Sequence, residues 1–445
     1  MSKTIQRKRV SCTSRKYLTS IPAFLMLTAC AGMQAGTGAG KRVSELDAIS
    51  ANYSPSEREA LSRVYQEGER NSVLNFNELG IAALEAEHFN VAELAFNESI
   101  QRIEKIYAND ANAKKAKSVF AAERVKDFKG EPYERAMAYY YRGLLYARAG
   151  DYQNARASFL AADYQDTVAE KEEYQGDFGL MNYLAAWSTS CDGDKANAKD
   201  LLNSGIQKDP SIRTLSADKP MLYIFETGQG PVKGVAGKHK EVLTFSARPN
   251  ASDIPGSLSN GPSNWVKSGD LVLQATTRGG RPIQGILDGK AKLKDGTQVA
   301  GGVMLQVGTQ SALLGAFSGN DNLALAGSAL AGVGALFSLM STAMVPTADT
   351  REWVSLPESI YLNEETAVRS TSGPFKAQFT SPGSVGGDAV LQHWGKQGIC
   401  AIAWGRSRIN RILNDHRKLE ISNKPRDDIF RKELIQKLAP QEAKA

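Results

Sequence analysis

The stretch from Ala136 to Thr167, AMAYYYRGLLYARAGDYQNARASFLAADYQDT, decides the fold of the N-terminal half of this 445-residue chain. Its small and aromatic residues recur at helical spacing on both sides of Gly150-Asp151, a dipeptide that turns the chain. Gly143 and Ala155 allow two antiparallel helices to approach closely, and aromatic side chains fill the space around that contact. We read the pattern as structural, and its positions are Tyr139, Gly143, Tyr146, Ala155 and Phe159.

The same pattern recurs on both sides of this predicted hairpin. An upstream copy places Gly80 and Phe96 in the same frame. Residues 179–210 form a third, weaker copy with Gly193-Asp194 at its turn. A charged insertion, residues 109–129, separates the first two copies. The sequence therefore predicts a short and irregular series of helical hairpins.

The order of these residues resembles that of tetratricopeptide repeats. The resemblance implies a stacked helical array over residues 50–215 that presents a concave surface to a protein or peptide partner. Tyr140 and Tyr141 lie off the packing frame, so we expect them to contact that partner. Such an array favours binding over catalysis.

A second informative stretch is Leu27-Thr28-Ala29-Cys30, which follows basic residues and a short apolar run. That order is typical of a secretory signal peptide, here residues 1–29, and its end resembles a bacterial lipobox, which implies lipidation of Cys30. A transmembrane helix is the alternative, but the apolar run is too short to span a bilayer. Ala31 in place of Asp implies the outer membrane, facing the periplasm, and residues 30–49 predict a flexible tether.

The distribution of charge argues against nucleic acid as a partner. The sequence has 54 Lys+Arg and 48 Asp+Glu, which gives a net charge of +6. All of this excess precedes Cys30, so the chain is formally neutral once the signal peptide is removed. It lacks the basic excess that binding to phosphates requires. The expected membrane contact is instead made by lipid at Cys30.

Beyond residue 215, short apolar runs separated by Gly, Pro, Asn and Asp replace the helical period. The expected strands are Met221–Phe225, Glu241–Phe245, Asp270–Thr276, Gln298–Val307 and Gly398–Trp404, with hairpin turns at Asp288-Gly289 and Asp295-Gly296. They predict a β-rich sandwich or open barrel over residues 216–405, followed by a basic helix and tail over residues 406–445. The expected fold class is α+β and multidomain, a helical array followed by a β-rich domain.

The segment from Leu323 to Val345 has 23 residues and no charged side chain. A helix of this length extends about 35 Å, enough to cross a bilayer. Two interpretations stay open: a helix buried against the β-rich domain, or a segment for self-association or membrane insertion. The second interpretation makes the chain an oligomeric membrane-inserting or channel component.

Downstream of that segment, residues 348–357 read ADTREWVSLP, and residues 225–233 read FETGQGPVK. Both stretches resemble a family of poorly characterised bacterial outer-membrane lipoproteins that combine tetratricopeptide-like helices with a C-terminal β-rich domain. The resemblance implies no activity. Asp349 and Arg351 are close enough in sequence to form an ion pair. The side chain of Trp353 can pack where the strand that follows it begins. The motif is therefore a structural element or a recognition surface.

No pattern in the sequence predicts catalysis, a metal site or a cofactor. The four histidines have no second ligand at metal-site spacing, and the nearest imitation of a nucleophile elbow, residues 382–386, reads as a loop. Cys191 and Cys400 remain after processing, and they form one long-range disulfide or stay as two buried thiols. We expect a protein-binding scaffold, not an enzyme, in an envelope assembly, export or cell-wall pathway.

Overall fold

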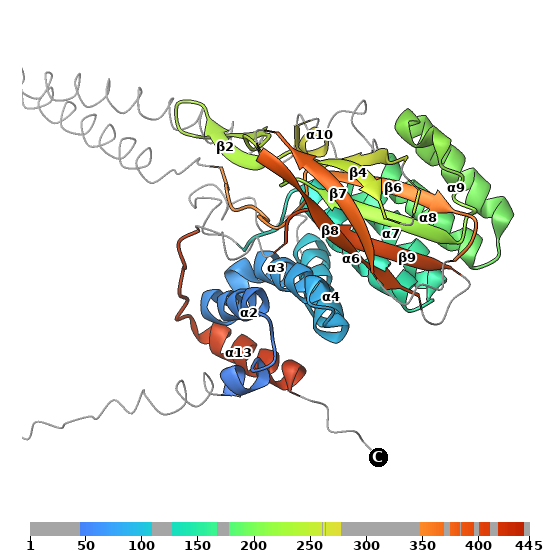
Figure 1. Cartoon of the computed structure of the whole chain (residues 1–445). Helices are drawn as coiled ribbons and strands as arrows, with labels where there is room; N and C mark the ends of the chain where they lie inside the picture. Colours follow the sequence, from blue (N-terminus) through green and yellow to red (C-terminus); the bar gives the residue numbers. More distant parts are fainter. Residues whose placement is uncertain are drawn as a thin grey trace, which may run out of the picture.

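The structure is a computed structural model that describes residues 45–439 apart from 109–126, 167–177, 260, 263, 277–347, 369–373, 383, 396–399 and 410–416. Helices form its N-terminal half: α2 (Pro55–Glu67), η1 (Gly68–Asn71), α3 (Ser72–Glu85), α4 (Phe89–Ala108), α6 (Pro132–Arg148), α7 (Tyr152–Asp166), α8 (Gly179–Cys191), α9 (Lys195–Lys208) and η4 (Pro210–Thr214). A sheet follows them, so the predicted order of a helical half and a β-rich half is confirmed (Figure 1).

The helices stack as hairpins in which α3 packs on α4, α6 on α7 and α8 on α9. Gly143 permits the close contact in the second hairpin, because a Cβ there would lie 2.5 Å from the ring of Phe159. Gly80 meets the ring of Phe96 at the same distance in the first hairpin. Gly193 turns the third hairpin with a φ of 96°, a conformation that glycine adopts without strain.

The strands are β1 (Met221–Thr227), β2 (Val232–Ala236), β3 (Val242–Ser246), β4 (Ile254–Leu258), β5 (Val266–Asp270), β6 (Ser359–Glu365), β7 (Phe375–Ser381), β8 (Ser384–Trp394) and β9 (Ala401–Arg406). Seven form a curled sheet in the order β4-β7-β8-β9-β1-β6-β5, and β2 pairs separately with β3 (Figure 1). β1 is parallel to β9 and antiparallel to β6. All seven residues of β1 are buried, as an apolar strand inside a covered sheet requires.

The sheet is apolar on both faces. On one face, Ile224 and Trp404 join residues of the helices in the largest apolar cluster. On the other face, Tyr223 and Phe225 pack inside the curl against residues of β7, β8 and β9. The helical half and the β-rich half therefore share one core.

A disulfide between Cys191 and Cys400 joins the end of α8 to the start of β9, across 209 positions of sequence. The alternative of two separate thiols is therefore wrong. The sequence left this open because the pairing depends on where the sheet folds back onto the third hairpin. The hydroxyl of Tyr152 donates to the carbonyl of Cys400 at 3.2 Å, so α7 reaches the same point.

One expected element is wrong. Residues 270–276 form the end of β5 and then the helix α10 (Leu271–Thr276), because Oδ1 of Asp270 accepts from the N–H of Leu273 at 2.8 Å and caps a helix. Arg406 is the last residue of β9, and residues 410–416 of the expected basic helix lie outside the described residues. The C-terminal helix is α13 (Pro425–Leu438), which starts at a proline, a residue favoured in the first turn of a helix.

Helix α13, near the C-terminus, packs against the first described residues and against α2. Its Phe430 and Leu434 share an apolar cluster with Leu61 and Val64 of α2 and with Leu46. Residues 45–49 are helical, so the predicted tether over residues 30–49 ends inside the folded part of the chain.

Several predictions lie outside the described residues: lipidation at Cys30, the strand Gln298–Val307, the turns at 288–289 and 295–296, and the apolar segment Leu323–Val345. Within the part of the chain that the structure describes, no helix has the length and apolar character needed to cross a membrane.

Candidate functional site: the inner surface of the helices

The inner surface of the helical array, formed by the first helix of each hairpin, is the candidate functional site. Nearly every residue of these helices is buried: 13 of the 14 in α3, 15 of the 17 in α6 and 12 of the 13 in α8. Helix α9, by contrast, buries only Ala198 and Gly205. The surface that the sequence assigned to a partner is therefore covered by the chain itself.

Residues 348–358, which we call the connecting segment, lie on this inner surface. The backbone N–H of Trp353 donates to Oε1 of Glu134 on α6 at 3.0 Å. The next N–H, that of Val354, donates to Oε1 of Glu78 on α3 at 2.8 Å. Both glutamates are buried, so each supplies an acceptor that the backbone would otherwise lack. The helices thus hold the connecting segment by its main chain.

The predicted pair of Asp349 and Arg351 is confirmed. Nε of Arg351 lies 2.9 Å from Oδ1 of Asp349, and Nη2 lies 2.5 Å from Oδ2. Nη1 of Arg351 donates to Oδ1 of Asn71 at 2.6 Å, which ties the connecting segment to η1. Burial alone would raise the pKa of Asp349, but the hydrogen bonds and charge of Arg351 outweigh burial and hold that pKa below its usual range.

Trp353 inserts between the hairpins. Its side chain is 3% exposed, and its ring centroid lies 5.8 Å from that of Tyr141 and 6.4 Å from that of Phe96. Its Nε1 donates to the hydroxyl of Ser355 at 2.9 Å, and this hydroxyl donates in turn to Glu78. Of the two interpretations of the motif, the contacts favour the structural one.

A buried ion pair between β2 and α6 supports the connecting segment. Nζ of Lys233 lies 2.6 Å from Oε2 of Glu134, and each side chain is 1% exposed. The same ammonium donates to the carbonyl of Arg351 at 2.8 Å. Burial is the largest influence on Glu134 and raises its pKa, although Lys233 acts in the opposite direction. Because a charge stranded here would be costly, the pair fixes one arrangement of helix, segment and strand.

The buried carboxylate of Glu226 in β1 contacts polar side chains from the helices and from β9. The hydroxyls of Tyr141 and Tyr140 donate to it at 2.7 Å and 3.2 Å. Nε1 of Trp404 donates to it at 2.9 Å, and Nε of Arg406 lies 3.2 Å from its Oε2. Both tyrosines are 0% exposed, so the prediction that they contact an outside partner is wrong. They lie off the hairpin frame because they face the sheet.

The sequence did contain a signal for this cluster. Glu226 directly continues the apolar run of β1, and a carboxylate on a buried strand needs buried donors. Burial raises the pKa of Glu226, with Arg406 acting in the opposite direction, and burial together with Glu226 raises the pKa of Tyr140 well above its usual range. The identity of the donors depended on the tertiary fold.

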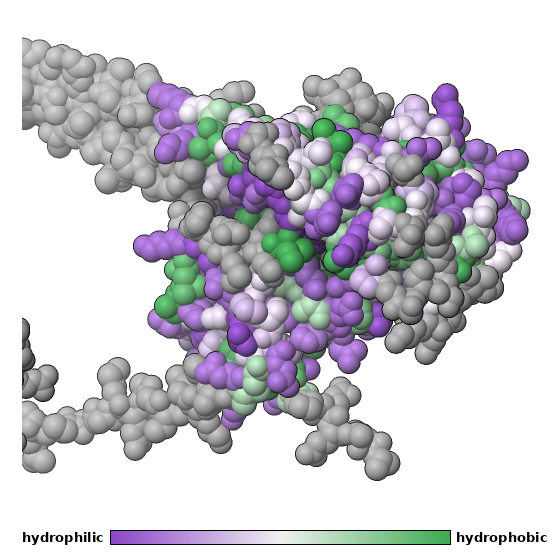
Figure 2. All heavy atoms as spheres, viewed as in Figure 1, coloured by the Kyte–Doolittle hydropathy of each residue, from purple (hydrophilic) through white to green (hydrophobic). Residues whose placement is uncertain are grey.

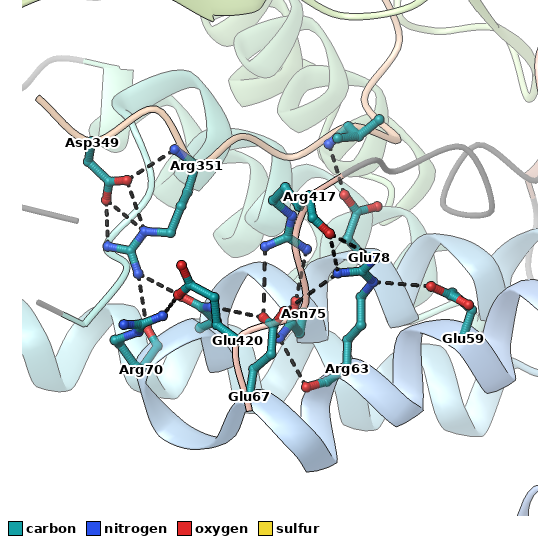
Figure 3. Close-up of polar contacts among 12 residues, drawn as sticks. Glu59, Arg63, Glu67, Arg70, Asn75, Glu78, Asp349, Arg351, Arg417 and Glu420 are labelled. Atoms are coloured by element: carbon teal, nitrogen blue, oxygen red, sulfur yellow. Dashed lines mark hydrogen bonds and ion pairs between the residues drawn. The ribbon is translucent and has the colours of Figure 1, made fainter. Parts of the chain in front are cut away.

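A second segment, residues 417–424, crosses α2 and α3. Nη1 and Nη2 of Arg63 each lie 3.4 Å from the carbonyl of Arg417. Nη2 of Arg417 donates to Oδ1 of Asn75 at 3.2 Å, and Asn75 donates to the buried Glu67 at 2.8 Å. Figure 3 shows Arg351 and Arg417 approaching these helices from two different segments. The helices therefore hold two passing stretches of chain.

The predicted structural residues have the expected role. Gly143, Ala155 and Phe159 are buried in the hairpin contact. Tyr139 is 7% exposed, and its hydroxyl donates to Oε1 of Glu104 at 3.0 Å. The guanidinium carbon of Arg142 lies 3.6 Å from the ring centroid of Tyr146, a cation–π contact. Within the described residues, no group of three or more His, Cys, Asp or Glu side chains is placed to hold a metal ion.

The geometry thus supports binding of polypeptide through backbone groups and an inserted aromatic ring, and the chain itself supplies that polypeptide. No family model, no curated protein and no solved structure matches this chain.

Proposed function

We propose that the chain is an outer-membrane lipoprotein, anchored by lipid at Cys30, that acts as a protein-binding scaffold in the cell envelope and carries no catalytic activity. The lipobox-like Leu27–Cys30 supports the anchor and its place in the envelope. The disulfide between Cys191 and Cys400 is consistent with an oxidising compartment such as the periplasm.

The observation that carries the proposal is the stack of hairpins in which the first helices are almost wholly buried, whereas the second helices keep an exposed face, widest in α9. The glycine-to-phenylalanine contacts of the first two hairpins support a tetratricopeptide-like array. Because the inner surface holds the connecting segment, we assign partner binding to the outer helices α4, α7 and α9. Exposed polar residues such as Arg156 on α7 and Lys199 on α9 are available there.

Site-specific photo-crosslinking in the cell envelope tests this assignment. A photo-reactive amino acid at Arg156 or Lys199 should give discrete protein adducts. The matched position is Val390 of β8, which is 50% exposed. Adducts of the same kind and yield from Val390, or none from the helices, would contradict the proposal.

The second candidate function is membrane insertion or channel formation by Leu323–Val345. One observation favours it: the described residues that flank 277–347 on either side both lie beside the β2–β3 hairpin. Helix α10 packs on β3, and the N–H of Ala348 donates to the carbonyl of Lys240 at 2.9 Å. Replacing residues 280–345 with a short Gly-Ser linker should then abolish detergent-resistant oligomers and leave the fold intact. An unchanged oligomeric mass would contradict this function.

A further inference from the structure

The chain enters the described structure at a surface formed by residues 45–54 and 417–438, which we call the entry surface. Leu46 belongs to the same apolar cluster as Phe430 and Leu434 of α13, so the two ends of the described chain meet there. Figure 1 shows α13 beside α2 at the end of the helical array remote from α9. Whatever precedes residue 45 therefore connects to this surface.

The entry surface exposes an unusual share of large apolar side chains. Nine such side chains are exposed among the described residues, and three of them, Leu419, Ile421 and Ile429, lie within eleven positions of each other. Ile421 is 65% exposed and Ile429 is 63% exposed. Figure 2 shows apolar atoms at the surface over the connection that leads into α13. Apolar residues gathered in this way mark an interaction surface.

Basic side chains flank these apolar residues, together with acidic ones: Asp428 precedes Ile429 and pairs with Arg431 at 3.3 Å, and Glu433 is exposed. Lys418, Lys424 and Lys432 are exposed, and none of them has an ion pair with another described residue. Lys432 lies one helical turn beyond Ile429, so both occupy the face of α13 opposite Phe430. Nearby basic residues differ: Arg426 is paired with Asp127 at 2.7 Å. Unpaired lysines beside exposed isoleucines suit an interface that is anionic and apolar together.

The length of chain before this surface limits its distance from the proposed anchor. Cys30 precedes residue 45 by 15 positions. A stretch of that length spans at most about 50 Å even when fully extended. The point at which the chain enters the described structure therefore lies within about 50 Å of the lipid proposed at Cys30.

We propose that the entry surface docks on anionic phospholipid, with Ile421 and Ile429 at headgroup depth and the three lysines against lipid phosphates. This inference rests on the proposed anchoring at Cys30, which would give it a membrane in reach. Docking would fix the orientation of the array, with α13 at the bilayer and α9 directed away from it. The acyl chains supply attachment, and the entry surface supplies orientation.

Vesicle flotation tests the inference without the acyl chains. The full mature chain with Cys30→Ser should float with vesicles of phosphatidylglycerol and phosphatidylethanolamine, and much less with phosphatidylcholine. Ile421→Ser with Ile429→Ser should weaken binding about tenfold. Replacing Lys424 and Lys432 with Gln should weaken it by several-fold per lysine. The matched control is Ile254→Ser with Val390→Ser, at sheet positions that are 57% and 50% exposed.

Three outcomes would overturn the inference: no flotation, equal losses from the sheet control, or full binding by the isoleucine variant. The last outcome would assign binding to another part of the chain, and the linker variant lacking residues 280–345 would show whether Leu323–Val345 is responsible. A fall in solution mass caused by Ile421→Ser and Ile429→Ser would instead make a second copy the occupant. The anchor itself is tested separately, by mass spectrometry of Cys30 in the native protein, so the two failures are distinguishable.

Discussion

The helical array makes two large contacts with the rest of the chain: its inner surface packs against the sheet, and α2 packs against α13 at the entry surface. Along the inner surface, Glu226 and Arg406 are 0% and 3% exposed and bind helices to sheet. At the entry surface, α13 covers α2 with apolar side chains, and the side chains of its ion pair between Arg426 and Asp127 are 41% and 45% exposed. The buried Arg431 of α13 also donates to the carbonyl of Tyr65 at 2.8 Å. A buried charge that loses its partner is costly, whereas an exposed pair contributes about 0–1 kcal/mol. The inner contact, which the disulfide between Cys191 and Cys400 also closes, should therefore be the harder of the two to separate.

The largest effect should come from breaking the inner contact at its centre. Glu226→Ala leaves three buried neutral donors, on Tyr140, Tyr141 and Trp404, without their acceptor. It also removes one of the two carboxylates beside Arg406, which keeps Glu85 at 2.8 Å, so we expect a loss of about 3–5 kcal/mol in the free energy of unfolding. Urea unfolding followed by tryptophan fluorescence measures it. Glu433→Ala on the exposed face of α13 is the control and should change stability by about 0.5 kcal/mol or less. Equal losses in the two variants would mean that Glu226 does not organise the joint.

The next largest effect should come from the disulfide, which closes the inner contact at the third hairpin. Cys191→Ser with Cys400→Ser frees a loop of 209 positions in the unfolded chain and should cost about 2–4 kcal/mol. Reductant should shift the unfolding midpoint of the unaltered protein to that of the variant. If reductant changes the midpoint of the double-serine variant by the same amount, the disulfide is not the cause.

A smaller global effect is expected at the entry surface, where the contact should be the easier of the two to separate. Phe430→Ala removes a buried ring, yet α13 can detach without unfolding the sheet, so the global loss should be about 1–2 kcal/mol. Limited trypsin digestion should cleave the variant first within residues 417–437, leaving the disulfide-linked core intact. Ile429→Ala is the neutral control, because that side chain is exposed. Simultaneous loss of core and α13 would show that the two contacts unfold together.

The smallest effect should be a change in acid sensitivity. The folded pKa of Asp349 lies below its unfolded value of about 3.9, so its contribution is present above that pH and is lost as pH falls through the folded pKa. Asp349→Asn should therefore flatten the acid limb of stability below about pH 5 and cost about 1 kcal/mol near neutrality. Parallel acid limbs in unfolding titrations of both proteins would contradict this.

Glu134, on the same inner surface, has a pKa shifted in the direction opposite to that of Asp349, so its effect on the pH dependence of stability has the opposite sign. Its folded pKa is raised, so its contribution to stability is present below its unfolded pKa and is lost as pH rises through the folded pKa. Glu134→Gln should accordingly steepen the acid limb that Asp349→Asn flattens. The two variants together separate the influence of burial from that of the arginine pair.

The elements set by local pattern were predictable from the sequence. The small-to-large pattern around Gly143 and Phe159 predicted a hairpin, and the apolar run from Met221 predicted the central strand. Short and ambiguous runs were not predictable: residues 271–276 satisfy a strand pattern, but Asp270 caps them as a helix. One capping hydrogen bond outweighs the weak strand preference of a six-residue run.

The contacts of the candidate site likewise include some that the sequence predicted and some that it did not. The sequence by itself determined the pair Asp349–Arg351, since two residues of opposite charge two positions apart need no tertiary fold to meet. It also determined the apolar positions of the hairpins and of β1, whereas the strands β4, β7 and β8 were not among the expected ones. Only the tertiary structure decided that Tyr140 and Tyr141 donate to Glu226, 86 and 85 positions away, and that Cys191 joins Cys400. The physical reason is that a buried polar group is satisfied by whatever the fold brings to it, and that neighbour is set by how the helices and sheet pack and not by the residues beside it in sequence.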